Sequence, residues 1–241
     1  MSTPAVLTKP LGGKAYGHIP HLPGSRLGPG DHHCHEGQAR ICLEKTRDKH
    51  DFVTVTEKLD GSCVAVARLG TEIAALGRAG WPAQSSPYEQ QQLFAHWVRL
   101  NVERFRRLLE DEERAVGEWL AQAHGTRYAL PHEPFVIFDI MAGAVRIPTM
   151  LARERAMRCG FIVPALLSEG SAVFSVAQAQ KEILISRHGA LDPVEGAVWR
   201  IERRGQFDFL AKWLRPDKQD GSLLPEVSGG EPIWNWSPAN K

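Results

Sequence analysis

The stretch FVTVTEKLDGSCVAVARLG, residues 52–70, carries alternating apolar and polar side chains on both sides of an Asp-Gly pair. Val53 and Val55 before the pair, and Val64 after it, follow the two-residue period of half-buried strands. Because Asp-Gly is typical of a tight turn between antiparallel strands, the stretch predicts a β-hairpin. Lys58 ends the first strand, so it is either a surface lysine beside a turn or a reactive amine.

The rest of the chain mixes strand and helix patterns without a regular βα period. Apolar side chains spaced by three and four residues between Ser85 and Leu120 predict a helix, broken once at most, with the charged run EDEERAV (110–116) on its solvated face. The other expected elements are strands at 71–77, 134–141, 161–167, 195–202 and 207–214, and helices at 149–158 and 175–186. This order favours an α+β fold with antiparallel sheets over a doubly wound parallel sheet.

The length of 241 residues and the 43% hydrophobic content allow a single domain with a substantial core. We expect one domain over residues 1–241, with a Gly-, Pro- and His-rich lead-in at 1–38. An irregular tail at 219–241 is expected to pack Trp234 and Trp236 on the core.

The formal net charge of +1 gives no global sign of nucleic-acid binding, so a polyanion site depends on local clustering of charge. The four cysteines show no CxxC pair and the N-terminus no secretory leader, which predicts a reduced, cytoplasmic protein. No apolar run reaches the roughly 18 residues of a membrane span, so no membrane partner is expected.

Further motifs support a reactive Lys58. K-x-D-G alone is weak, because a chain of this length contains it by chance roughly one time in twenty. Five more short motifs follow in the chain: GRAG with Arg78, VGEW with Glu118, FVIFDI with Phe138 and Asp139, VEGAVWR with Glu195, and FLAKWLRPDK with Lys212. Together they favour the reactive amine over the surface turn.

This ordered set resembles the covalent nucleotidyltransferases, the superfamily of polynucleotide ligases and messenger RNA capping enzymes, and within it the RNA ligases that seal nicked duplexes. The resemblance covers roughly residues 16–218. It implies a ligase adenylation fold, in which two antiparallel sheets flanked by helices hold a nucleotide pocket between them. It also implies ATP as the AMP donor and Mg²⁺ or Mn²⁺ as the metal.

The resemblance assigns a role to each motif. Lys58 is implied as the nucleophile, with Glu57, Asp60 and Gly61 beside the nucleotide; Arg78 and Lys212 at the phosphates; Glu118 at the ribose hydroxyls; Phe138 stacked on the purine; and Glu195, with Asp139 second, at the metal. A free lysine has a pKa near 10.4, so only about one molecule in a thousand is reactive at neutral pH. We expect cations and basic groups near Lys58 to lower its pKa.

One position departs from the family pattern. The second lysine of the terminal K-x-K motif is Leu214 here, and either Arg215 or Lys218 is expected to replace it. Side chains of a strand alternate in direction, so Lys212 and Leu214 point the same way and Arg215 the other. This geometry favours Lys218 slightly.

The implied activity is RNA joining, as in RNA repair. ATP would convert Lys58 to a lysyl-AMP phosphoramidate, AMP would pass to an RNA 5′-phosphate, and a 3′-hydroxyl would displace it. The 23 residues after Lys218 are too few for an OB-fold or a helical C-terminal domain, so a partner protein could supply end binding. The alternatives are a DNA ligase-like or capping-type enzyme, an adenylyltransferase with a non-RNA target, and a non-enzymatic module that binds nucleic-acid ends.

Two other groups have alternative readings. The run DHHCHEG (31–37) has no second Cys/His pair at zinc-finger spacing, so a loop near the nucleotide or the RNA end is favoured over structural zinc. The arginines 146, 153, 155 and 158 form either a polyphosphate footprint or a helix surface paired with Glu154.

Overall fold

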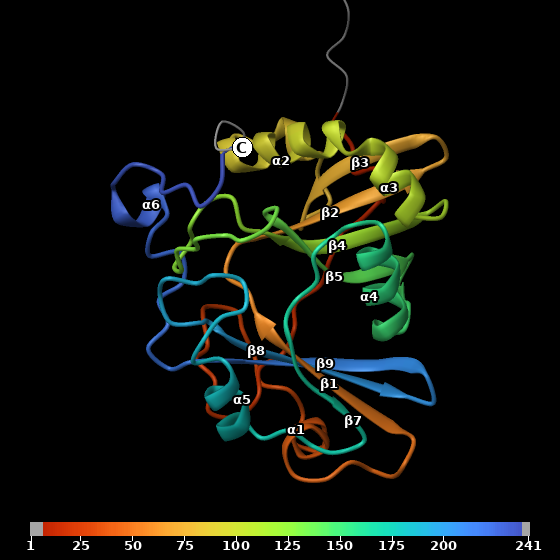
Figure 1. The fold of residues 1–241 in the computed structure, drawn as a ribbon, viewed down its shortest axis with the longest axis vertical. Helices are drawn as coiled ribbons and strands as arrows, with labels where there is room; N and C mark the ends of the chain where they lie inside the picture. The colour runs from red at the N-terminus through yellow and green to blue at the C-terminus, as the bar shows by residue number, and fades with distance from the viewer. Residues whose placement is uncertain (1–6, 238–241) are drawn as a thin grey trace, which may run out of the picture.

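The computed structural model describes residues 7–237, and two antiparallel sheets stack face to face within it (Figure 1). The four-stranded sheet has the order β7-β1-β8-β9, and the five-stranded sheet has the order β3-β2-β4-β5-β6. Their strands are β1 (Asp51–Lys58), β2 (Ser62–Leu69), β3 (Glu72–Gly77), β4 (Glu113–Trp119), β5 (Phe135–Ala142), β6 (Val145–Arg146), β7 (Leu166–Gly170), β8 (Gly196–Arg203) and β9 (Gln206–Leu214). The predicted α+β class is confirmed.

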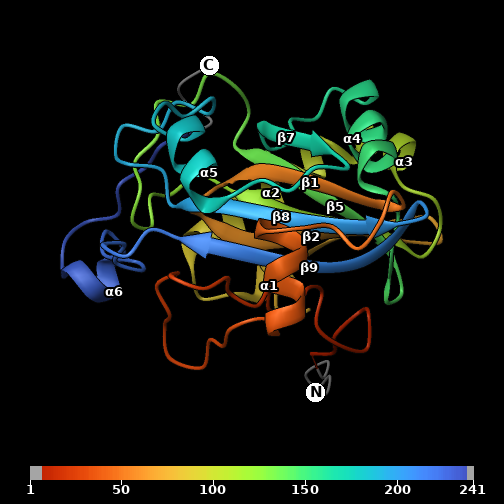
Figure 2. The same ribbon diagram turned by 90° about the horizontal axis from the view of Figure 1, so that it is seen from below.

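Helices cover the outer face of each sheet, as the perpendicular view in Figure 2 also shows. The five-stranded sheet packs against α2 (Glu89–Leu100), α3 (Val102–Leu108) and α4 (Thr149–Arg158), and the four-stranded sheet against α1 (Glu36–Leu43) and α5 (Val176–Glu182). The 3₁₀ turn η1 (Ala83–Ser85) precedes α2, and α6 (Pro225–Ser228) lies in the tail. No helix within residues 7–237 is both long and apolar enough to cross a membrane.

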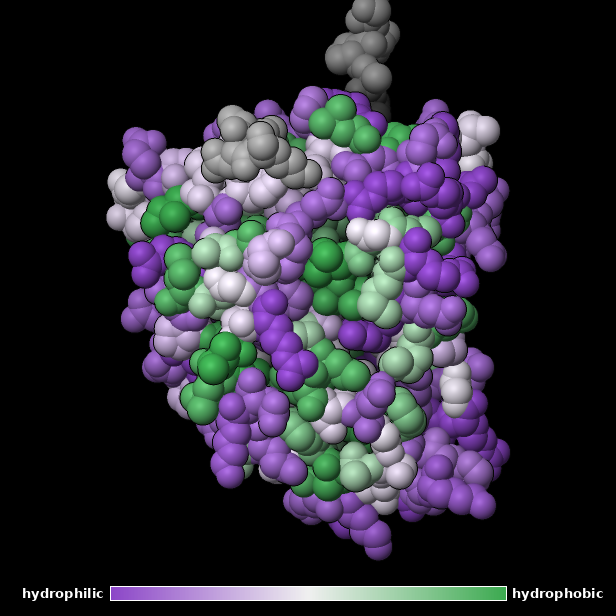
Figure 3. All heavy atoms as spheres, viewed as in Figure 1, coloured by the Kyte–Doolittle hydropathy of each residue, from purple (hydrophilic) through white to green (hydrophobic). Residues whose placement is uncertain are grey.

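Each layer has its own apolar core. Phe94, Trp97 and Phe135 belong to the cluster between the helices and the five-stranded sheet, where Trp236 packs against Trp119, with 5.9 Å between the ring centres. Trp234 packs against the same cluster, so the expected docking of both tail tryptophans is confirmed. On the face drawn in Figure 3, apolar side chains gather towards the middle and polar ones towards both ends.

The predicted hairpin is wrong. β1 and β2 lie in different sheets, so the residues Leu59–Gly61 cross from one layer to the other. Gly61 is required at this crossing because a Cβ there would lie 2.5 Å from the Trp119 carbonyl oxygen. Gly61 thus lets the chain lie close to β4 as it enters the five-stranded sheet, and Lys58 is brought to the gap between the sheets.

The predicted helix over 85–120 is too long. The structure has two shorter helices in this range, α2 and α3. The second half of the charged run, from Glu113 on, begins the buried strand β4. Glu113 is buried because Arg155 pairs with it, with 2.5 Å between nitrogen and oxygen. The expected solvated helix face is therefore wrong: Glu113 begins the central strand β4, where Arg155 pairs with it, and Glu118 lies further along the same strand.

Other boundaries shift by a few residues. The strand expected at 161–167 begins only at Leu166, and Pro164, which has no N–H to donate, precedes it. The helix expected to reach Ser186 ends at Glu182. The outermost parts of the expected lead-in and tail, residues 1–6 and 238–241, lie outside the described residues.

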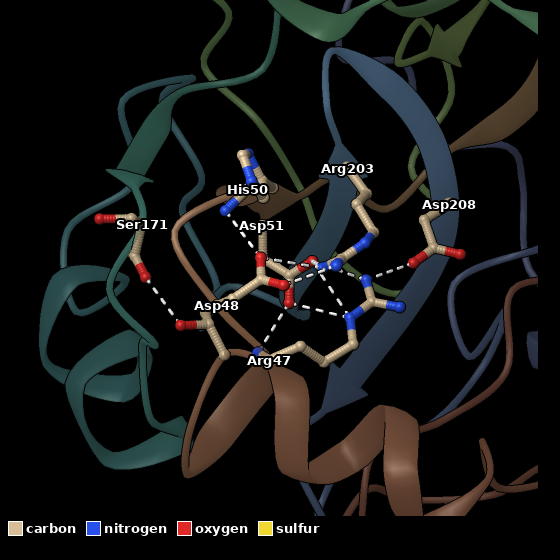
Figure 4. Close-up of polar contacts among 8 residues, drawn as sticks. Arg47, Asp48, His50, Asp51, Ser171, Arg203 and Asp208 are labelled. Carbon is tan, nitrogen blue, oxygen red and sulfur yellow. Dashed lines mark hydrogen bonds and ion pairs between the residues drawn. The ribbon is translucent and has the colours of Figure 1, made fainter.

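The start of β1 is fixed by a network of ion pairs, drawn in Figure 4. The buried Asp51 carboxylate accepts hydrogen bonds from Arg47 at 2.8 Å and from Arg203 at 2.9 Å. These arginines also bind Asp208 and Asp48, respectively. The network joins the loop before β1 to β8 and β9, and so holds the strand whose other end carries Lys58.

Candidate active site

A cavity of about 760 Å³ lies between the two sheets. Both sheets contribute to its walls: Lys58, Val198 and Lys212 come from the four-stranded sheet, and Glu118 and Phe138 from the five-stranded sheet. The sequence motifs, which are up to about 150 residues apart in the chain, therefore meet at one site.

Lys58 is held by an acidic neighbour. Its Nζ donates to Glu195 Oε2 at 2.8 Å and to the Leu59 carbonyl oxygen at 2.9 Å. Burial opposes the charged ammonium, but the carboxylates of Glu195 and Glu118 outweigh burial and raise the pKa of Lys58 above its usual range. The protein's own groups do not give the expected lowering of this pKa, because the side chains that act most strongly on the amine are acids.

Glu118 lies on β4 directly opposite Cys63 of β2 and points into the cavity. The Gly61 N–H donates to its Oε1 at 3.1 Å. Burial and the nearby acids Glu195 and Asp60 outweigh the attraction of Lys58 and raise the pKa of Glu118 to about 7. The carboxyl group retains acceptor capacity towards the cavity.

Asp60 faces a different partner. Its carboxylate is ion-paired with the buried Lys218 and accepts a hydrogen bond from the Gly125 N–H at 3.0 Å. Arg215 instead binds Asp217 at 2.6 Å. Of the two residues considered for the second lysine of the motif, it is therefore Lys218 that binds the segment following Lys58.

Phe138 and Asp139 are neighbours on β5 with different surroundings. Phe138 lines the cavity and contacts Tyr16 edge-on, with 5.2 Å between ring centres. The buried Asp139 carboxylate accepts from Arg146 at 2.7 Å and from Arg200 at 2.9 Å. Because these arginines compete with a metal ion for its oxygens, the arrangement favours a structural role for Asp139.

A basic wall closes the side of the cavity near the N-terminal segment. Arg78 donates to the Gly17 carbonyl oxygen at 2.7 Å, and the Lys212 N–H donates to the Pro20 carbonyl oxygen at 2.9 Å. Burial and the positive charge of Lys58 lower the pKa of Lys212, while Asp31, 3.9 Å away, opposes this shift. The residues 17–22 thus link the two sheets beside both phosphate-binding candidates.

Glu57 points to the other face of β1, as strand alternation requires. Its carboxylate accepts from the Ser186 hydroxyl at 2.5 Å and from the Arg187 N–H at 3.2 Å. Its own N–H donates to the Ala165 carbonyl oxygen at 2.9 Å. The Glu57 side chain therefore fixes the loop behind the cavity, although the residue also borders the cavity.

The loop behind Glu57 contains a buried histidine whose titration should affect stability. His188 Nε2 accepts from the Ala165 N–H at 3.0 Å, which requires the unprotonated nitrogen. Burial, then His132, lowers the pKa of His188 to about 4. The unfolded chain binds a proton near pH 6.5, so stability is complete above that pH and falls as the pH drops towards 4.

We therefore expect the free energy of unfolding to fall by about 2 kcal/mol between pH 7 and pH 5 through this group. Urea denaturation of the wild type and of His188→Gln at both pH values measures it. The variant should be less stable at pH 7 but lose less on acidification. An equal loss in both proteins would contradict the assignment.

The remaining candidates have mainly structural contacts. Arg158 pairs with Glu154, as expected of a helix-surface arginine, whereas Arg155 pairs with Glu113 of β4. Arg153 lines the cavity and donates to the Pro164 carbonyl oxygen at 2.8 Å. The His-rich run lies beside β9, where His33 and Lys212 both pair with His21. Among residues 7–237, no three Asp, Glu, His or Cys side chains are grouped to hold a metal ion.

Sequence reasoning missed several residues that line the cavity, among them Val198 and Thr54. Val198 is partly buried and packs, as Phe138 does, against the apolar cluster between the sheets. Thr54 is buried, and its Oγ1 finds no hydrogen-bond partner within the described residues. Thr54 lies four residues before Lys58 on β1, and Val198 is paired with Thr56, so both side chains are on the same face of the sheet as Lys58. Strand alternation counted from Lys58 would have indicated Thr54.

The lysine at the floor of a cavity between two antiparallel sheets is the arrangement that the resemblance to the nucleotidyltransferases implied. Residues 51–214 match the RNA ligase family, and the match covers more than half of the 241-residue chain. The chain belongs to the RNA ligase family. None of the curated proteins searched matches it.

Solved structures of one ligase share the fold. A lysine-to-alanine variant of Naegleria gruberi RNA ligase with ATP and Mn has a TM-score of 0.55 at 19% identity, over 81% of this chain and 58% of that chain. A glutamate-to-alanine variant with AMP and Mn has a TM-score of 0.54 at 18% identity, over 81% and 59%. The same ligase with PPi has a TM-score of 0.53 at 18% identity, over 81% and 58%. This chain thus spans less than two thirds of the length of those proteins.

Proposed function

We propose that this protein is an ATP-dependent RNA ligase that joins 5′-phosphate and 3′-hydroxyl ends through AMP bound covalently to Lys58. The Lys58 amine, held by Glu195 at the floor of the cavity, carries this proposal. Family membership supports it, and the Naegleria ligase structures contain ATP, AMP and PPi, the compounds that such a reaction uses or releases.

The cavity offers each part of a nucleotide a suitable partner. We infer that the purine stacks on Phe138 with Val198 against its other side, a contact typically worth about 1–3 kcal/mol per base. Glu118 would accept hydrogen bonds from the ribose hydroxyls. Arg78 and Lys212 would then lie at the phosphates, where positive charge balances the charge that develops during transfer.

The residues around Lys58 fit a divalent metal ion. Glu195 is buried, and its Oε1 accepts no hydrogen bond within the described residues. Because Mg²⁺ is usually held by one or two carboxylates together with substrate phosphates, a single Glu195 ligand is sufficient. When bound, Mg²⁺ or Mn²⁺ would neutralise phosphate charge and compete with the Lys58 amine for Glu195.

In the first step, the deprotonated Lys58 Nζ attacks the α-phosphorus of ATP. An N–P bond forms, and the P–O bond to pyrophosphate breaks. An oxygen of the RNA 5′-phosphate then attacks the same phosphorus and releases the lysine amine. Finally, the 3′-hydroxyl attacks the 5′-phosphorus, AMP leaves, and the strand is joined.

The domain boundaries, the partner protein and the cellular location are also proposals. Because both sheets contribute to the cavity, we propose that residues 1–241 act as one adenylation domain. The partner protein that could supply end binding and the cytoplasmic location remain predictions from the sequence.

Incubation with ATP labelled at the α-phosphate and a 5′-phosphorylated RNA nick tests the function. We expect label first on the protein and then on RNA, with a sealed product. Label that stays on the protein until another acceptor is added would indicate an adenylyltransferase with a non-RNA target, and no label at all would indicate an end-binding module. Stronger labelling by GTP would indicate a capping-type enzyme.

Thr54 provides a prediction on nucleotide binding. Replacing it with valine keeps the shape and removes a buried hydroxyl that lacks a partner, so the ligand-free protein should gain about 1 kcal/mol of stability. If this hydroxyl binds the nucleotide, ATP affinity should fall about three- to tenfold. Thermal melts and ATP titrations measure both effects.

Thr126→Val is the matched control. Thr126 is also buried with an unpartnered hydroxyl, but it does not line the cavity. It should raise stability and leave ATP affinity unchanged. If Thr54→Val behaves in the same way, Thr54 does not contact the nucleotide.

A further inference from the structure

The cavity extends beyond the predicted nucleotide site to the segment after β3. Trp81 and Tyr88 line this extension, and their exposed fractions are 44% and 51%. Within residues 7–237, no other Phe, Tyr or Trp side chain is as exposed. Neither residue belongs to an apolar core cluster, so packing does not explain them.

The strand order places this extension relative to the nucleotide. Phe138 is on β5, Glu118 on β4 and Arg78 directly after β3, and the sheet order is β3-β2-β4-β5. Adjacent strands are about 4.8 Å apart, so Phe138 and Arg78 are separated by roughly 14 Å across the sheet. Base, ribose and phosphate candidates therefore follow one another towards the β3 edge.

Trp81 lies just past that edge. Its carbonyl oxygen accepts from the Gly77 N–H at 2.9 Å, and Pro82 pairs with Leu76 of β3. The segment that carries Trp81 thus runs along the free side of β3. A group bound there would be next to the α-phosphate and on the side away from the adenosine.

The same side is positively charged. The Lys9 ammonium lies 4.9 Å from the centre of the Trp81 ring, and Arg78 lines the adjoining part of the cavity. Aromatic side chains bind nucleobases by stacking, and neighbouring cations attract the phosphate backbone. An exposed tryptophan alone would be unremarkable, but two aromatics beside basic groups in the cavity of the nucleophile suit a nucleic acid end.

We propose that Trp81 and Tyr88 form a stacking surface for the terminal nucleobase of the RNA strand that carries the 5′-phosphate. The inference rests on the proposed ligase function. In the second step an oxygen of that 5′-phosphate attacks the α-phosphorus, and the N–P bond to Lys58 breaks. The 5′-phosphate must therefore reach the Arg78 side, and its own nucleoside is the first group that follows it.

The experiment follows the second step alone. The protein is first labelled with AMP and then mixed with 5′-phosphorylated RNA that has either a normal or an abasic terminal nucleotide. Wild-type protein should transfer AMP to the abasic RNA at least about tenfold more slowly. Trp81→Leu should show a similar loss with normal RNA and little further loss with abasic RNA, because the removed base and the removed ring interact with each other.

Three controls separate the possible outcomes. Trp81→Phe should restore most of the transfer, Tyr88→Leu should lower it, and Leu100→Ala, an exposed change at the far end of α2, should not affect it. All variants should form protein–AMP at the wild-type rate, which shows that the nucleotide site is intact. If wild-type protein forms no protein–AMP, that result contradicts the proposed ligase function rather than the stacking of the base on Trp81 and Tyr88.

Two results would overturn the inference. One is wild-type transfer that is insensitive to the terminal base. The other is a Trp81→Leu variant that remains as sensitive to base removal as the wild type. In either case the aromatic surface does not bind this base and is available to a protein partner instead.

Discussion

Replacing Lys58 with alanine should reduce AMP labelling of the protein to background. Lys58 is the lysine whose amine is hydrogen-bonded to Glu195 at 2.8 Å at the floor of the cavity. A lysine-bound AMP is a phosphoramidate, so the wild-type label should be lost in acid. Gel analysis after incubation with labelled ATP measures the label.

Three comparisons make the result specific. Lys58→Arg keeps a positive charge beside Glu195 but offers no amine that deprotonates near neutral pH, so it should also fail. Lys181→Ala, an exposed change on α5, should label normally. Lys58→Ala should still seal RNA that already carries AMP on its 5′-phosphate, because the last step does not use the lysine nucleophile. Wild-type labelling of Lys58→Ala would disprove the assignment.

The acids around Lys58 add a condition to its reactivity. Glu195 and Glu118 stabilise the ammonium, although attack on phosphorus requires the free amine. The site must therefore change its charge balance when the nucleotide binds. Labelling should depend strictly on a divalent cation, and chelation with EDTA should abolish it.

The sequence predicted that Lys58, Glu118, Phe138 and Lys212 lie at one pocket, which the structure shows, but not how the chain brings them together. Alternation around Lys58 and the ordered motifs were sufficient for the α+β class and for the shared cavity. Asp60-Gly61 was interpreted as a hairpin because turn chemistry is local. Whether the strands on either side pair with each other depends on distant partners, here β8 for β1 and β4 for β2.

Charge patterns gave the weakest predictions. The run at 110–116 appeared to be a solvated helix face because four of its residues are acidic, yet Glu113 is buried on a strand by pairing with Arg155. Asp139 appeared suitable for a metal, but Arg146 and Arg200 occupy its oxygens. Arg155 is 42 residues from Glu113 and Arg200 is 61 residues from Asp139, so no local pattern reveals these partners. Arg146 is only 7 residues from Asp139, but the short return strand β6 that brings it back was not predicted.

The second large effect concerns the buried pair of Asp60 and Lys218. The side chain of Lys218 is 1% exposed and that of Asp60 is 9% exposed. Removing one partner of a buried ion pair leaves an uncompensated charge and typically costs about 3–5 kcal/mol. Lys218→Met should therefore lower the melting temperature by about 10 °C.

The double variant Asp60→Asn with Lys218→Met distinguishes a structural lysine from a catalytic one. Removing both charges together should recover most of the lost stability, because a neutral pair of similar volume has no buried charge to compensate. If Lys218 only fixes the loop after Lys58, the double variant should also recover AMP labelling. If Lys218 replaces the missing lysine at position 214 and contacts the α-phosphate, stability should return while labelling stays low. Melting curves and labelling rates for both variants decide between these roles, and Lys181→Met is the exposed control. An unchanged melting temperature in Lys218→Met would contradict the buried ion pair itself.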